Sequence, residues 1–202
     1  MDPELARRAL DTFRLAPLAA GDFRTYGPRG VIGLVEGEIL TENRGWADGI
    51  DLEQDILKVA VIERHRGTRH IGVGYLRGYG LKEGAVASSV AHDSHNISGA
   101  GTDEASMAAA ANRVAENRGG IAVWAADGCA AQVALPIAGL MSPHSLEQVA
   151  QDLEAAKTAA LRQGVRPGID PFMTLSFLAL PVIPALRLTT RGIFDVTAQR
   201  YL

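Results

Sequence analysis

The fold of this chain is decided by the stretch from Ile56 to Leu76, which reads ILKVAVIERHRGTRHIGVGYL. Its first part, Ile56–Glu63, is rich in β-branched residues, which favour strands. Arg66–Arg69 contains the glycine of a turn, and Ile71–Leu76 resumes the strand pattern. The stretch is therefore predicted to be a β-hairpin.

Glycines at positions 72 and 74 interrupt the returning strand. Glycine inside a strand indicates a bulge or the close approach of another backbone. With Gly78 and Gly80 they could also suggest a phosphate-binding loop, but that loop needs a G-x-G-x-x-G turn leading from a strand into a helix. Because these glycines alternate within or beside a strand, we interpret them as packing glycines.

Further strands are expected on both sides of this hairpin. Val31–Val35 and Ile39–Thr41 form one short pair, and Asn43–Asp51 is polar enough to be a loop. Ile121–Ala125 and Ala130–Leu135 form another pair around an Asp-Gly turn.

Three helices are expected from capping residues and apolar periodicity. One begins at Pro3 with Asp2 as its N-cap, one is capped by Thr102, and one is capped by Ser145 and ends at Gly164. Their apolar faces consist of Leu5, Leu10 and Phe13; of Met107, Ala110, Ala111 and Val114; and of Leu146, Val149, Leu153, Ala156 and Ala160.

Two stretches carry no clear helix signal. Gly78–Gly101 is dense in glycine, alanine and serine, and the segment from Asp170 onward is apolar, with short extended pieces near Leu186 and Val196.

Strands that arrive as hairpins, rather than alternating with helices, indicate an α+β fold. We expect a layered domain whose largely antiparallel or mixed sheet is built from hairpins and packed by two to three helices. Residues 1–202 are expected to form a single domain, and only a weak signal near Leu81 indicates a boundary between subdomains. A (β/α)₈ barrel needs about 250 residues and does not fit.

Composition bounds the function further. The net charge is −3 and the basic residues form no cluster, which argues against a nucleic-acid-binding protein. The sequence has no apolar run of about 18 residues that would span a membrane, and its first residues lack the pattern of a signal peptide. Cys129 is the single cysteine, so a cytoplasmic location is expected.

The densest polar cluster is SSVAHDSHN, residues 88–96. Within it, His92, Asp93 and His95 could bind a metal or transfer protons. On a helix the two histidines would share a face, whereas on a strand they would point to opposite faces. Two histidines leave the coordination of a metal incomplete, so other ligands would be needed. The alternative is a polar loop or helix cap in which Asp93 bonds the local backbone.

Two other candidate sites are weaker. A Ser88–His92–Asp93 triad is disfavoured, because sequence neighbours rarely reach the geometry of a triad and no G-x-S-x-G elbow is present. The run Glu63-Arg64-His65 lies at a strand end, where loops often line sites, but a solvated hairpin turn is the simpler interpretation.

Four runs together resemble the C-terminal part of bacterial adenine deaminases, members of the amidohydrolase superfamily. These runs are Glu63-Arg64-His65 with the glycine-rich strand, Gly80–Asn96, Leu135–Ser142 and Asp170–Pro181. They stand in the family's order, and the resemblance extends roughly from Leu10 to Asp195. Ile97–Gly101 departs from it, because the family has an apolar strand where this chain has small and polar residues.

The resemblance implies hydrolysis of adenine to hypoxanthine and ammonia by a metal-bound hydroxide that attacks C6 of the purine. It also implies manganese or iron, held by an N-terminal barrel domain. The sequence contains no His-x-His pair and is too short for the barrel. The chain is therefore expected to be a C-terminal portion with no metal site of its own, inactive without the barrel.

The resemblance also implies roles for the polar residues. We expect the loop of residues 88–96 to face the mouth of the barrel, with His92, Asp93 and His95 as catalytic residues. The expected substrate-binding residues are Glu63, His65, Ser88, Ser89 and Asn96. The expected partners are adenine, the barrel domain and, through exposed apolar surface, further copies of the chain.

Two other interpretations stay open. In one, the chain is a binding or oligomerisation module whose polar loop is structural and whose apolar C-terminal segment packs against the barrel or another subunit. In the other, it is an independent metal hydrolase built on His92 and His95.

Overall fold

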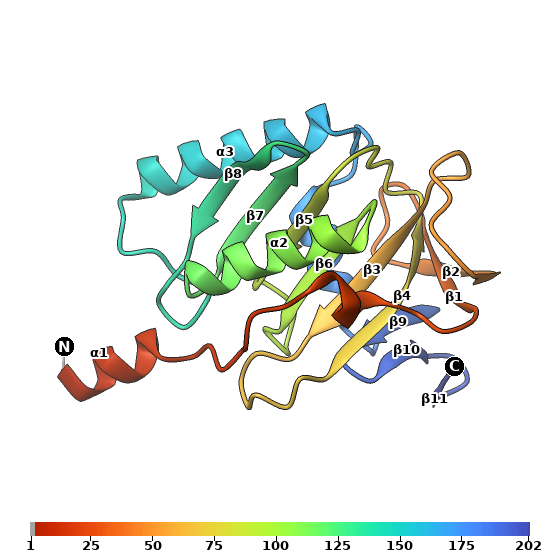
Figure 1. Ribbon diagram of the computed structural model, residues 1–202, viewed down its shortest axis with the longest axis horizontal. Helices are drawn as coiled ribbons and strands as arrows, with labels where there is room; N and C mark the ends of the chain where they lie inside the picture. The colour runs from red at the N-terminus through yellow and green to blue at the C-terminus, as the bar shows by residue number, and fades with distance from the viewer. Residues whose placement is uncertain (1–2) are drawn as a thin grey trace.

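The computed structural model of the protein describes residues 3–202, and one mixed sheet of eight strands runs through it (Figure 1). Across the sheet lie β2 (Thr41–Ala47), β1 (Arg29–Leu34), β4 (Ile71–Arg77), β3 (Ile56–Ile62), β6 (Ile97–Gly101), β5 (Ala85–Ser88), β7 (Gly120–Ala125) and β8 (Gly128–Ala134). Neighbouring strands are antiparallel except β1 and β4, which are parallel.

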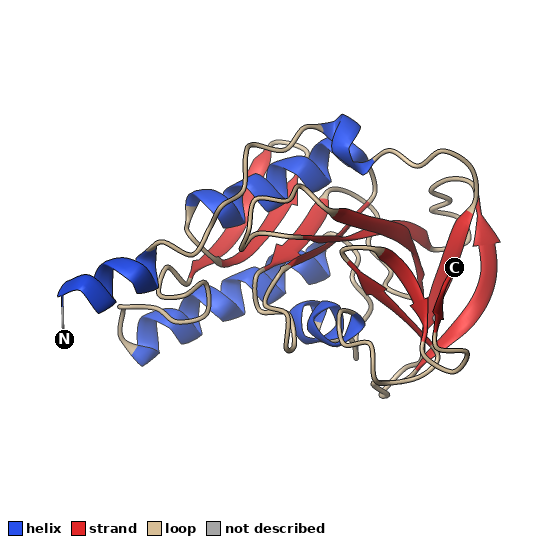
Figure 2. Cartoon of the chain, turned by 90° about the horizontal axis from the view of Figure 1, so that it is seen from below, coloured by secondary structure: helices blue, strands red, loops and turns tan. Residues whose placement is uncertain are grey.

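Helices cover both faces of this sheet (Figure 2). The helix α2 (Glu104–Glu116) and the 3₁₀ turn η1 (Ala20–Phe23) lie on one face, and α3 (Leu146–Arg162) and α4 (Pro171–Leu178) lie on the other. The short helix α1 (Pro3–Leu10) lies at one end of the molecule. The layered α+β fold expected from the sequence is confirmed.

Alternating residues of the central strands supply the two cores, as expected for a sheet buried on both sides. On the α2 face the core includes Ala60, Ile62, Ala85, Ala87, Met107, Ala111 and Val114. On the α3 and α4 face it includes Val59, Val61, Val86, Ala156, Ala160, Phe172 and Leu175. Each fully buried large apolar side chain stabilises the fold by about 1.5–3 kcal/mol.

A second, three-stranded antiparallel sheet of β9 (Leu186–Thr189), β10 (Gly192–Asp195) and β11 (Arg200–Tyr201) packs against β4. This packing explains the glycines of β4. A Cβ atom on Gly72 would lie 1.8 Å from the carbonyl oxygen of Thr189. The close backbone approach predicted from the sequence is confirmed.

The helix caps are those predicted from the sequence, except that the cap of α2 lies one residue later. Asp103, rather than Thr102, caps α2 by accepting the N–H of Ser106 at 2.7 Å, because the Thr102 hydroxyl donates to the carbonyl of Gly84. Ser145 caps α3 as predicted. The predicted cap Asp2 lies outside the described residues.

Two other expectations were wrong in part, and one segment without a helix signal begins with a helix. Much of the polar run 43–51 belongs to β2 rather than to a loop, because an edge strand tolerates exposed charged residues. Leu146 is 81% exposed and lies off the buried face of α3. The apolar segment after Asp170 begins with α4, whose first N–H groups are accepted by the Asp170 carboxylate.

The unusual segment Ile97–Gly101 is β6, a central strand in which all five residues are buried. Its small residues are required by the layers that cover it. A Cβ on Gly101 would lie 2.5 Å from Cγ of Met107 in α2, and one on Gly99 would lie 3.0 Å from the carbonyl oxygen of Val86.

Candidate functional site

The antiparallel register brings the two polar runs of the sequence together at the same end of the central strands β3, β5 and β6. Residues 88–96, the polar loop, run from Ser88, the last residue of β5, to the start of β6. Strands β3 and β6 pair with Ile62 opposite Ile97. The run 63–65, which follows β3, therefore lies beside the end of the polar loop.

The buried side chain of Arg64 holds the backbone of the polar loop by a hydrogen bond. It is 1% exposed, and its Nε donates to the carbonyl of His95 at 2.5 Å. Its other nitrogens donate to the carbonyls of Thr12 and Ala138, each at 3.0 Å, and its guanidinium lies 4.2 Å from the centroid of the Phe13 ring. Burial lowers the pKa of Arg64 to about 10, so the group keeps its charge at neutral pH. One side chain thus ties together the N-terminal segment, the polar loop and the turn around Ala138.

His65 and Glu63 complete this support. Nε2 of His65 lies 2.9 Å from the carbonyl oxygen of Ser94. The Glu63 carboxylate accepts the N–H groups of His65, Arg66 and Thr68 at 2.5–3.0 Å. Burial alone would raise the pKa of Glu63, but these hydrogen bonds from the turn lower it to about 2. Both carboxylate oxygens are therefore engaged in fixing the turn that carries His65.

The backbone of the polar loop is constrained. Asp93 and His95 have φ angles of 61° and 47°, in the left-handed region that non-glycine residues rarely adopt. Such conformations cost on the order of 1–3 kcal/mol each and persist only where the surroundings hold them. The hydrogen bonds to the carbonyls of Ser94 and His95 supply that restraint.

His92 and Asp93 are the outward-facing pair of the loop. Their side chains are 47% and 75% exposed, and Oδ1 of Asp93 lies 3.3 Å from Nδ1 of His92. The His92 ring stacks on Phe177 of α4, with the ring centroids 5.3 Å apart. A carboxylate beside Nδ1 favours a proton on that nitrogen, which leaves Nε2 as an acceptor.

The inner residues of the loop differ from this pair. Nδ1 of His95 and Oδ1 of Asn96 are buried, as is Oγ of Ser98 in the adjoining strand β6, and none has a hydrogen-bond partner among the described residues. A buried polar atom without a partner costs about 1–3 kcal/mol. Apart from Ser88, the loop is neither helix nor strand, so the face that His92 and His95 would share on a helix does not form.

The two serines at the start of the loop are fully buried. The Ser88 hydroxyl accepts the N–H of Val90, and the Ser89 hydroxyl accepts the N–H of Gly120 and donates to the carbonyl of Gly139 at 2.6 Å. Their hydroxyls are therefore engaged in backbone contacts that fix the loop.

The sequence analysis placed Arg64 in a candidate run without giving it a role, and it did not single out Phe177. Arg64 stands between two candidate residues, two positions after the buried strand β3, where a guanidinium has backbone carbonyls within reach. Phe177 carried no signal, because its contact with His92 joins segments 85 positions apart.

No group of three or more His, Cys, Asp or Glu side chains in residues 3–202 is arranged to hold a metal ion. None of the helices formed by these residues is long and apolar enough to cross a membrane.

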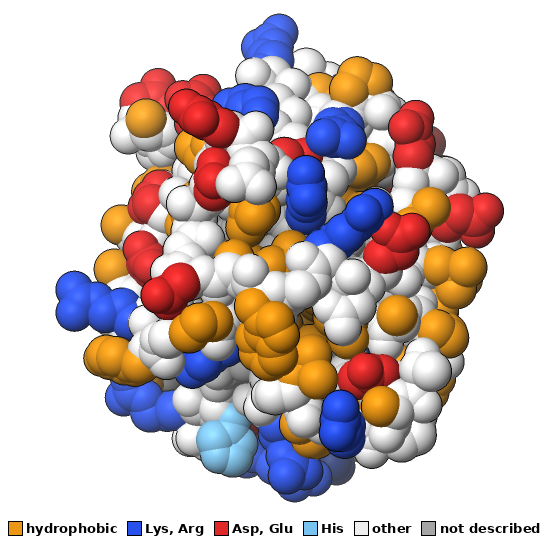
Figure 3. All heavy atoms as spheres, turned by 90° about the vertical axis from the view of Figure 1, so that its right-hand side faces the viewer, with side chains coloured by type: hydrophobic (Ala, Val, Ile, Leu, Met, Phe, Trp, Pro, Cys, Tyr) orange, Lys and Arg blue, Asp and Glu red, His pale blue; other side chains and the backbone are white. Residues whose placement is uncertain are grey.

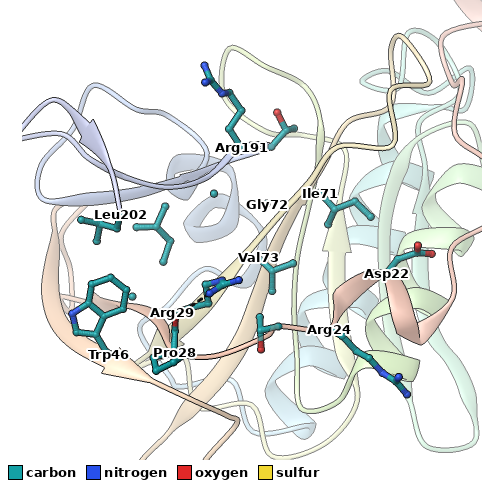
Figure 4. Close-up of a pocket in the computed structure, with 15 residues that line it drawn as sticks. Asp22, Arg24, Pro28, Arg29, Trp46, Ile71, Gly72, Val73, Arg191 and Leu202 are labelled. Carbon is teal, nitrogen blue, oxygen red and sulfur yellow. Dashed lines mark hydrogen bonds between the residues drawn. The ribbon is translucent and has the colours of Figure 1, made fainter.

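A cavity of about 500 Å³ lies elsewhere, between β1, β4, β10 and the segment before β1. Figure 4 shows that Arg29 lies across this cavity, whereas Arg24 and Arg191 extend away from it in different directions. The guanidinium groups therefore do not converge on one ligand position. Hydrophobic side chains gather on this side of the molecule between lysine and arginine side chains (Figure 3), and Trp46 is 61% exposed.

Comparison with known proteins gives a consistent result. The family model described as adenine deaminase C-terminal domain matches residues 36–200. An adenine deaminase of Methylobacterium nodulans is 46% identical over 200 residues, which cover 94% of this chain and 35% of the relative. One of Archaeoglobus fulgidus is 43% identical over 203 residues, which cover 98% of this chain and 35% of the relative. One of Bacillus licheniformis is 48% identical over 152 residues, which cover 75% of this chain and 26% of the relative. The chain spans between about a quarter and about a third of the length of these relatives.

Proposed function

Because this chain belongs to the adenine deaminase C-terminal domain family, we propose that it forms the C-terminal domain of an enzyme that hydrolyses adenine to hypoxanthine and ammonia. The relatives that it resembles carry the name adenine deaminase, and each is about three times as long as the matched part. In this proposal residues 1–202 act as one domain, and the longer enzyme contains a further, metal-binding part.

The observation that carries the proposal is the exposed His92–Asp93 pair on a restrained loop. The pair is held from two sides, by Phe177 against the His92 ring and by Arg64 and His65 against the loop backbone. A histidine placed in this way can accept or donate a proton at Nε2. Deamination of adenine requires such transfers to the ring and to the departing amine.

The remaining candidate residues act mainly through the loop. Glu63, His65, Ser88 and Ser89 fix its backbone with the hydrogen bonds described above. His95 and Asn96 have buried atoms that lack partners, which supports a role in which substrate or the rest of the enzyme completes their hydrogen bonds.

The metal, manganese or iron by the family resemblance, does not fit residues 3–202, because they contain no suitable ligand cluster. We assign it to the other part of the longer enzyme and derive no step through it. The free thiol of Cys129 supports a reducing, cytoplasmic compartment. Association of several copies stays a prediction that sedimentation of the enzyme would measure.

The proposal is tested with the purified chain, for which metal content and ammonia release from adenine are measured. We expect far less than one metal ion per chain and no ammonia above background, because the chain lacks the metal ligands. The full-length enzyme that contains this domain is the control, and it should release ammonia in the same assay. Metal near one ion per chain together with adenine-dependent ammonia release would contradict the proposal.

A further inference from the structure

The helix α4 has an exposed side that its sequence does not explain. Six of the eight residues in PFMTLSFL are apolar, and Pro171, Phe172, Leu175 and Leu178 are buried against the sheet. Met173, on the outward side, is 46% exposed. A helix that is apolar all round is normally covered on every side.

A hollow of about 140 Å³ lies beside this exposed side. Met173 and Phe177 form one wall, and Ile39 and Leu40, which are 52% and 46% exposed, form the other. Polar and charged residues also line the hollow, namely Glu38, Thr41, Thr174 and Arg187. An apolar cavity of about 150 Å³ accepts a group the size of benzene. The hollow therefore has room for roughly one apolar side chain of a partner.

The walls of the hollow are fixed in place. Arg187, which is 1% exposed, donates to the carbonyl of Ile39 at 2.6 Å and to that of Ile183 at 2.7 Å. The Thr41 hydroxyl donates to the carbonyl of Leu186 at 2.8 Å. A partner would meet a preformed surface, which reduces the ordering cost of binding.

The hollow is continuous with the polar loop, because Phe177 contributes to its wall and also stacks on His92. A partner that covers this side of α4 would therefore also lie close to His92. In these relatives the part outside the match is about twice as long as the matched part. That length is enough to cover the hollow.

We propose that the hollow and the exposed side of α4 are the surface on which the metal-binding part of the longer enzyme docks, inserting one apolar side chain between Met173 and Leu40. This inference rests on the proposed function. Its occupant is another part of the same enzyme rather than a second copy of this chain.

The test is methionine oxidation by dilute peroxide, read by peptide mass spectrometry, in the chain alone and in the full-length enzyme. In the chain alone, Met173 and Met141 should oxidise readily, since they are 46% and 56% exposed, and Met107 should not, since it is 3% exposed. In the full-length enzyme we expect Met173 to oxidise at least about tenfold more slowly. Equal oxidation of Met173 in both proteins would overturn the inference. Slow oxidation of Met173 in a dimer of the chain alone would also overturn it, because a second copy would then cover the hollow.

A pair of variants keeps the test independent of catalysis. Met173→Lys should lower the melting temperature of the full-length enzyme but not that of the chain alone, where the side chain reaches solvent. Leu161→Lys is the control, because Leu161 is 47% exposed on α3, outside the hollow. Protection of Met173 without any effect of replacing His92 would uphold the docking surface while removing the proposed catalytic role.

Discussion

Replacing Arg64 by alanine is expected to destabilise the chain by about 3 kcal/mol, because three backbone carbonyls lose a charged donor and are left buried. The same change should release the polar loop, whose left-handed residues then lose a restraint. Urea unfolding measures the first effect, and the NMR signals of the His92 and His95 rings report the second. Arg64→Lys should restore part of the stability but not the paired contacts of the guanidinium.

Arg187→Ala is the matched control. Arg187 is equally buried and also donates to three backbone carbonyls, those of Ile183, Ile39 and Pro184, in another part of the fold. We expect a similar loss of stability from this variant but an unchanged signal of the His95 ring, because the hollow that Arg187 supports includes Phe177, the neighbour of His92, but not His95. If both variants disturbed the polar loop equally, Arg64 would have no specific part in holding it.

Replacing Gly72 by alanine should be at least as damaging. The new Cβ would overlap the carbonyl oxygen of Thr189, a backbone atom that can move only if the small sheet moves with it. Overpacking of this kind costs typically 1–3 kcal/mol, and we expect a value near or above about 3 kcal/mol because backbone meets backbone. The midpoint of urea unfolding provides the measurement.

Gly49→Ala is the control for this change, because a Cβ at Gly49 would meet no atom within 4 Å. Its unfolding free energy should stay within about 0.5 kcal/mol of the parent. A Gly72→Ala variant as stable as the Gly49→Ala variant would show that the two sheets do not pack as closely as described.

The sequence predicted the parts of the fold that rest on local signals. The hairpin of β3 and β4 follows from β-branched runs around a turn, and α3 follows from its cap and apolar period. The sequence could not show that the polar run after Thr41 is an edge strand, because backbone pairing with β1 decides that. It also left β5 and β6 unassigned, since their small residues are explained only by the helices packed on both faces.

The candidate site shows the same division. The polar loop was visible as a dense run of serine, histidine and aspartate, and the resemblance linked it to the run at the end of β3. The sequence could not show the register between β3 and β6, which pairs Ile62 with Ile97. This pairing brings Arg64 within hydrogen-bond distance of the His95 carbonyl. Nor could it separate the exposed pair, His92 and Asp93, from the buried serines of the same run.

The most direct test of the central claim is the turnover number of the full-length enzyme carrying His92→Ala, with adenine as substrate. If His92 presents a proton-transferring nitrogen to the active site, kcat should fall by about 100-fold while the melting temperature stays unchanged. His144→Ala, which removes an exposed histidine outside the polar loop, should leave kcat as it is. Unchanged kinetics in the His92→Ala enzyme would contradict the claim that this domain contributes to the active site through its polar loop.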